Sequence, residues 1–123
     1  MPATSIGARG TTTIVAATSA AGSAPTNATD GYTNESDGGL VTTYLDYTGT
    51  VTAAVVRLYV REAGGTEWRR GASTADLSPL APASGDEARD WEIGEGREFT
   101  FVVESIAQTG GGTISVRAAG VSR

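Results

Sequence analysis

Apolar and polar residues alternate along two stretches in the middle of the chain, residues 41–47 and 54–61. A period of two is typical of a strand with one buried face and one solvated face. Thr48-Gly49 separates the two stretches, and Ala63-Gly64-Gly65-Thr66 separates the second from Glu67–Arg70. We therefore predict two antiparallel strands followed by a hairpin turn. Their buried face takes every second residue: Val41, Thr43, Leu45, Tyr47, Ala54, Val56, Leu58 and Val60.

The rest of the chain repeats this pattern. Residues 11–18 are rich in β-branched residues, 97–106 place Phe99, Phe101 and Val103 on one face, and 113–119 form a closing strand after a glycine turn at 109–112. No helical periodicity of useful length interrupts them. About six to eight short strands with glycine-rich turns predict an all-β fold, a single antiparallel sandwich with jelly-roll-like topology. Its bulky core residues are expected to be Leu45, Leu58, Trp68, Trp91, Phe99 and Phe101.

Two segments fall outside the predicted sandwich. Residues 1–10 are small and polar apart from Ile6 and Arg9, and we expect an extended N-terminal arm preceding a domain of residues 11–123. Residues 72–88 contain two prolines and few apolar side chains, and are predicted to be a long loop. Leu77 and Leu80 would expose apolar surface to water, so we expect one or both of these side chains to be docked against another surface.

Composition limits the chemistry available to the chain. Its 123 residues suit one domain with a single core, and the sequence has no cysteine, histidine or lysine. It therefore lacks a thiolate nucleophile, an imidazole base and a Schiff-base amine. We expect no enzymatic activity and no cofactor, although paired carboxylates remain an open, weaker route to a glycan-active enzyme.

The net charge and the hydrophobicity of the chain limit the partners that it is expected to bind. The net charge of −5 disfavours nucleic acid, which requires a basic surface. No apolar stretch approaches the ~20 residues that a membrane-spanning helix needs, and no secretion signal is expected. Acidic residues gather in 84–104, where a solvated face is the preferred interpretation.

Two groups of residues are candidates for binding. Asp30, Glu35 and Asp37 supply oxygen ligands within a short loop, which makes them a weak candidate calcium site. On the solvent face of the two central strands, tyrosine and arginine side chains form a row that suits a protein interface, an ordinary solvated sheet or, less well, sugar stacking. This row comprises Tyr44, Arg57, Tyr59, Arg61 and Arg70.

The stretch from Asp30-Gly31-Tyr32 to Gly65-Thr66-Glu67-Trp68 resembles the β-sandwich domains of tailed-phage virion proteins. The closing strands at 99–104 and 113–119 fit the same layout. Such domains occur in capsid decoration (cement) proteins and in head or tail fibres, and they are similar to galactose-binding-like carbohydrate modules. The resemblance therefore implies a virion protein without catalytic residues.

A single small domain with an extended arm suits a protein attached to a capsid surface better than the receptor-binding tip of a fibre. We expect a trimeric decoration protein on the outer capsid surface that contacts the major capsid protein. Its contact residues are expected to include Ile6, Arg9, Leu77 and Leu80. The alternative is a carbohydrate- or receptor-binding module of a head or tail fibre.

Overall fold

The computed structural model describes residues 4–7, 10–77 and 86–121, except for the side chains of Asp76 and Leu77. These residues form strands joined by loops, with one helical turn, α1 (Thr74–Leu77). The strands are β1 (Thr4–Ile6), β2 (Thr12–Thr18), β3 (Tyr32–Asn34), β4 (Leu40–Arg61), β5 (Arg69–Ser73), β6 (Glu87–Glu92) and β7 (Glu98–Gly120). None of the described helical residues forms a segment long and apolar enough to cross a membrane.

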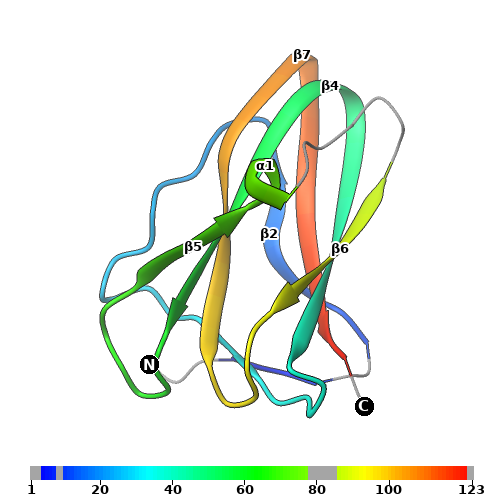
Figure 1. Ribbon diagram of the computed structural model, residues 1–123. Coiled ribbons are helices and arrows are strands. Elements are labelled where there is room, and N and C mark those ends of the chain that lie inside the picture. Colours follow the sequence, from blue (N-terminus) through cyan, green and yellow to red (C-terminus); the bar gives the residue numbers. More distant parts are fainter. Residues whose placement is uncertain (1–3, 8–9, 78–85, 122–123) are drawn as a thin grey trace.

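The fold is built on one long antiparallel ribbon. β4 and β7 contain 22 and 23 residues and pair from Val41 opposite Gly120 to Arg61 opposite Glu98. Figure 1 shows this ribbon curving over at the top, so that it has two legs. One leg, the start of β4 with the end of β7, is flanked by β6 and β2. The other leg is flanked by β5 and β3, and β3 pairs with β1 in parallel.

The two legs form the two layers of a sandwich, and the core lies between them. The Trp91 ring of β6 meets the Phe101 ring of the other layer edge-on at 5.0 Å, and Phe101 contacts Phe99 at 5.8 Å. The buried indole Nε1 of Trp91 donates a hydrogen bond of 2.8 Å to the Thr43 hydroxyl. The predicted all-β sandwich is confirmed. The predicted inward residues of β4 and Phe99 are buried, except that Tyr47 and Val60 are only half-buried.

Glycines make the bend possible. Gly49, Gly110 and Gly111 have φ angles of 65°, 66° and 84°, in the left-handed region that glycine adopts without strain. The pairing register also shifts between Thr48 and Thr50, as at a β-bulge. A methyl group on Gly112 would overlap the backbone carbonyl of Thr50, so the two paired backbones approach here to a separation that only glycine permits.

The structure corrects two predicted turns. Thr48-Gly49 and residues 109–112 do not end strands, because β4 and β7 continue through them and bend. The predicted strands on either side of Thr48-Gly49 consequently lie in different layers and pair with β7 instead of with each other. By contrast, the turn predicted at 63–66 is present between β4 and β5, where the Gly65 N–H donates to the Glu62 carbonyl.

Trp68 is not part of the core. It lies over the guanidinium of Arg61, 4.2 Å from the ring centroid, and its ring contacts Gly31 so closely that a Cβ there would overlap it. Trp68 follows the 62–67 turn, which places it half-buried against Arg61 and Gly31 and not among the core residues.

The predicted arm is wrong for the part of residues 1–10 that the structure describes. Thr4–Ile6 form β1, and Ile6 is 2% exposed within the core cluster. The Glu35 N–H donates to the Ile6 carbonyl at 2.9 Å, and the Gly120 N–H donates to the Gly7 carbonyl at 2.8 Å. An edge strand gives this segment its order, so these residues belong to the sandwich. Of the predicted 72–88 loop, residues 72–77 and 87–88 instead belong to β5, α1 and β6.

We predict that Gly112→Ala destabilises the protein by about 1–3 kcal/mol, because the new methyl group must push Thr50 away at the bend. Urea unfolding followed by circular dichroism measures the loss. Gly94→Ala is the matched control: its Cβ would meet no atom within 4 Å, and we expect a change within ~0.5 kcal/mol. An equal loss of stability in both variants would contradict the close approach of β4 and β7 at this point.

We predict that Ile6→Ala lowers the free energy of unfolding by about 2–5 kcal/mol, as for a buried aliphatic residue. Thr4→Ala, at an exposed position of the same strand, should have little effect. If both variants unfold at the same urea concentration as the parent protein, β1 does not contribute to the core in solution.

Candidate functional site

The predicted row of tyrosine and arginine side chains does not form one surface. Tyr44 lies on the first leg of β4, while Arg57 and Tyr59 lie on the second leg. Because the legs belong to opposite layers, these side chains point out from opposite faces of the sandwich. The row is therefore divided into two separate groups, and each has its own neighbours.

On the second leg, Arg57 is occupied by ion pairing. Its Nε and Nη2 donate to the two carboxylate oxygens of Glu104 at 2.8 and 3.0 Å, and its Nη1 donates to the Gly71 carbonyl at 3.0 Å. The Arg70 guanidinium lies 3.5 Å from the same carboxylate, with its side chain 63% exposed. Hydrogen bonding from Arg57 lowers the pKa of Glu104 below its ordinary value. Of this group, Arg70 is the cation most open to a partner.

Arg61 is buried, contrary to its expected place on the outer row. Its Nε donates to Glu98 at 2.8 Å, and the second Glu98 oxygen accepts the Gly64 N–H at 2.8 Å. The two side chains are 6% and 10% exposed, and Trp68 covers the guanidinium. Burial alone would raise the pKa of Glu98, but the Gly64 N–H and the Arg61 guanidinium outweigh it and lower the pKa. The pair fixes the 62–68 turn against the start of β7.

On the first leg, Tyr44 is covered by an arginine from β7. The Arg117 guanidinium lies 5.4 Å from the centre of the Tyr44 ring, and its Nε donates to Asp46 at 2.7 Å. The side chains of Arg117 and Asp46 are 40% and 34% exposed. The ion pair compensates the charge of Arg117, and the arginine occupies one face of the ring that a sugar would need for stacking.

The remaining predicted contact residues are either buried in the core or outside the described part of the chain. Ile6 is in the core, so its side chain is not an exposed surface contact in this structure. Leu77 ends α1, and its side chain lies outside the described part of the chain, as do Arg9 and Leu80. The expected docking of Leu77 and Leu80 stays a prediction.

The three carboxylates proposed for calcium do not converge. Among the residues that the structure describes, no group of three or more acidic, histidine or cysteine side chains is close enough to hold a metal ion. Asp30, Glu35 and Asp37 are each exposed, and the Ser5 hydroxyl lies 3.5 Å from a Glu35 oxygen. The proposed calcium site is therefore wrong: these residues are close in sequence, but β3 separates Asp30 from the other two.

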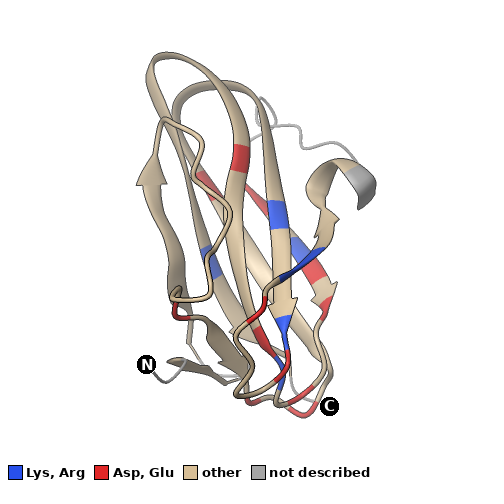
Figure 2. Cartoon of the chain, turned by 90° about the vertical axis from the view of Figure 1, so that its left-hand side faces the viewer, with Lys and Arg blue, Asp and Glu red and all other residues tan. Residues whose placement is uncertain are grey.

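The sequence interpretation missed a surface that the bend creates. Residues 48–53 and 107–112 meet at the top of the arch, and all of them except Val51 and Gly112 are exposed. We call this surface the neutral tip, because none of its residues is charged. Figure 2 shows no blue or red segment on the arch. The signal was present as three stretches without a charged residue: 10–29, 47–56 and 105–116.

The opposite, open end is acidic. The turns at 35–39, 62–68 and 92–97 lie there, and Figure 2 shows the acidic segments concentrated at the bottom of the molecule. Their exposed carboxylates outnumber the exposed Arg97, and they are Glu35, Asp37, Glu62, Glu67, Glu92 and Glu95. The net charge of −5 is thus distributed unevenly along the long axis.

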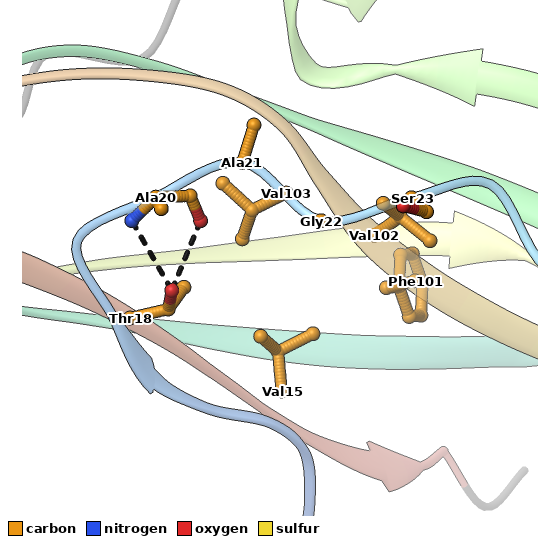
Figure 3. A pocket seen from close by; sticks show the side chains of 9 residues that line it. All are labelled: Val15, Thr18, Ala20, Ala21, Gly22, Ser23, Phe101, Val102 and Val103. Carbon is orange, nitrogen blue, oxygen red and sulfur yellow. Dashed lines mark hydrogen bonds between the residues drawn. The ribbon is translucent and has the colours of Figure 1, made fainter.

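Two hollows accompany these surfaces. Between β2 and β7, a pocket of about 240 Å³ is lined by Val15, Phe101, Val103 and the 18–23 segment (Figure 3). The Thr18 hydroxyl fixes that segment through hydrogen bonds with Ala20, and the Gly22 N–H donates to the Val103 carbonyl. A wider, open hollow of about 620 Å³ lies at the acidic end, lined by Gly38, Gly39, Leu40, Glu92, Gly94 and Arg97.

Comparison with known proteins gives a resemblance in fold. No protein-family model and no curated protein matches the chain. A solved structure with a similar backbone is the SPBc2 prophage-derived protein YomS, which is 13% identical and aligns over 89% of this chain and 88% of its own, with a TM-score of 0.49. A likeness at this level carries no argument about function.

The Arg61–Glu98 pair predicts acid sensitivity. Because the folded-state pKa of Glu98 is lowered, the pair's contribution to stability is complete above the ordinary glutamate pKa of about 4.3 and is lost as pH falls through the folded value. Glu98→Gln should destabilise the protein by about 3 kcal/mol at pH 7 and flatten the dependence of stability on pH below ~5. Urea unfolding between pH 7 and 3 measures both effects.

The matched control for that experiment is Glu95→Gln, an exposed carboxylate in the neighbouring turn. It should leave both the stability at pH 7 and the pH dependence close to those of the parent protein. A Glu98→Gln variant with an unchanged pH profile would show that the buried pair does not form in solution.

Proposed function

We propose that this chain is a non-enzymatic structural protein of a phage virion, a decoration protein that binds the outer surface of the shell through its neutral tip. The partner in this proposal is the major capsid protein, and several copies act together, as a trimer or in another symmetric arrangement. The acidic end then faces the solvent. The observation that carries the proposal is the uneven distribution of charge along the molecule.

Docking through the neutral tip has a low desolvation cost. Burying a charged side chain is expensive unless a partner compensates it, and the cores of protein interfaces are depleted of charge. The tip presents threonine hydroxyls, alanine methyl groups and glycine backbone, which a partner can cover without burying an ion. The acidic end, by contrast, would be costly to bury, which favours leaving it in water.

The tip also has a defined shape. Thr48 and Thr113 join β4 and β7 through a hydrogen bond between their hydroxyls, and the Gln108 side chain accepts a hydrogen bond of 2.9 Å from the Gly111 N–H. A surface that is ordered before binding loses less conformational entropy on docking. Each contact is small, but copies linked by symmetry convert weak single contacts into firm attachment.

A second candidate is a carbohydrate- or receptor-binding module of a head or tail fibre. The open hollow at the acidic end favours it: glycine backbone, a carboxylate and a guanidinium are groups that hydrogen-bond to sugar hydroxyls. In this case the acidic end would bind, and the tip would be joined to the fibre. Glycan-array binding that is lost in Arg97→Ala would favour this candidate over decoration.

Copy number decides between the two. Quantitative mass spectrometry of purified particles of the phage that encodes the chain should find this protein at hundreds of copies, comparable to the major capsid protein. A handful of copies would indicate a tail or fibre component. Its absence from the particles would remove both candidates.

Variants at the tip test the docking surface. Thr50→Glu and Gln108→Glu each place a carboxylate on the tip, and the second keeps the acceptor for the Gly111 N–H. We predict at least tenfold weaker binding to particles stripped of this protein, equivalent to about 1.4 kcal/mol, measured by co-sedimentation. Thr66→Glu adds the same charge to an exposed threonine at the acidic end and should bind normally. Normal binding by both tip variants would contradict the proposal.

A further inference from the structure

β1 is attached to the sandwich by a short stretch of pairing with β3 and by the burial of one side chain, Ile6. Three residue pairs join it to β3 in parallel, from Thr4 opposite Tyr32 to Ile6 opposite Asn34. The Thr4 N–H donates to the Gly31 carbonyl at 3.1 Å, and Ile6 fills a site in the core where it is 2% exposed. Without β1, the edge of β3 and the Ile6 site would both be open to another strand of the same sequence.

The connection from β1 to β2 contains glycine on both sides. A Cβ on Gly7 or Gly10 would meet no atom within 4 Å, and Gly10 has a φ of +71°. β1 belongs to the layer of β3, whereas β2 pairs with β7 in the other layer. β1 and β2 therefore lie in different layers. Rotation at Gly10 can redirect β1 once the hydrogen bond from the Gly120 N–H to the Gly7 carbonyl is broken.

We propose that β1 is exchanged between copies of this protein, so that the β1 strand of one copy pairs with β3 of its neighbour and places Ile6 in the neighbour's core. The contacts of β1 are the same within a copy and between copies, which is the condition for exchange of an identical element. The balance then depends on the effective concentration of the neighbouring β3 edge relative to the chain's own.

The occupant is defined by the chain itself. The Ile6 site and the β3 edge accept a short uncharged strand with one branched aliphatic side chain, and Thr4-Ser5-Ile6 supplies it. The inference rests on the proposed function at one point: a virion surface is where neighbouring copies are crowded enough for exchange to compete. In such a lattice the exchanged strand would link adjacent copies directly.

A cysteine trap detects exchange, since the chain has no cysteine of its own. Ser5 and Thr33 are paired across β1 and β3, at a backbone separation that suits a disulfide. The single variants Ser5→Cys and Thr33→Cys are mixed at high protein concentration in a thiol–disulfide buffer. We expect a dimer with a 5–33 disulfide, identified by peptide mass spectrometry. The control mixture replaces Thr33→Cys with Ala107→Cys, an exposed residue of the neutral tip.

The 5–33 dimer should be at least fivefold more abundant than the 5–107 dimer. Equal yields would mean random collision and would overturn the proposal. Gly10→Pro provides a second test, because proline holds φ near −65° and is incompatible with the +71° of the closed connection. It should raise the yield of the 5–33 dimer while the circular dichroism spectrum stays β-type. A folded Gly10→Pro monomer with no increase would also overturn the proposal.

Gly10→Ala serves if the proline variant fails to fold, since alanine also avoids this φ but retains its N–H. The trap is carried out in solution without particles, so its failure leaves docking through the neutral tip unaffected. Conversely, a positive trap with tip variants that bind particles normally would leave β1 exchange in place and remove the proposed docking surface.

Discussion

The close approach of the Gly112 and Thr50 backbones is the constraint on which the sandwich depends. A straight strand of 22 residues would extend about 70 Å, whereas a compact chain of 123 residues has a radius of gyration of about 14 Å. The β4–β7 ribbon must therefore fold back on itself. It does so where glycine lets the two backbones approach, and this bend brings Trp91 against Phe101 and closes the core between the legs.

The bend also determines the surfaces. It places residues of one uninterrupted strand on opposite outer faces, and each face neutralises its arginines with carboxylates from the paired strand: Arg57 with Glu104, and Arg117 with Asp46. Many of the exposed carboxylates lie in the turns at the open end. What remains at the fold of the ribbon is an exposed, ordered and uncharged surface, and this contrast between the two ends is the basis of the docking proposal.

Burial with a period of two could be predicted from sequence, since Leu45, Leu58 and Phe101 lie in runs whose alternation admits one inward face. The role of Thr48-Gly49 could not be predicted from sequence, because a left-handed glycine suits a hairpin turn and a β-bulge equally. Which of the two forms depends on pairing with a strand about 60 residues away in the chain. The same long-range register decides that Glu98 faces Arg61. Ile6 was missed because one apolar residue in a polar segment has no periodicity to reveal its burial.

The account's central claim is that β4 and β7 form one bent ribbon, and nuclear Overhauser effects test it most directly. Cross-strand contacts should continue through the bend, linking Thr48 with Thr113 and Thr50 with Thr109, and the side chains of Trp91 and Phe101 should be in contact. Contacts between residues 41–47 and 54–60 as adjacent paired strands, with none from either stretch to β7, would show a hairpin at Thr48-Gly49 and would contradict the bent ribbon, the two layers and the neutral tip together.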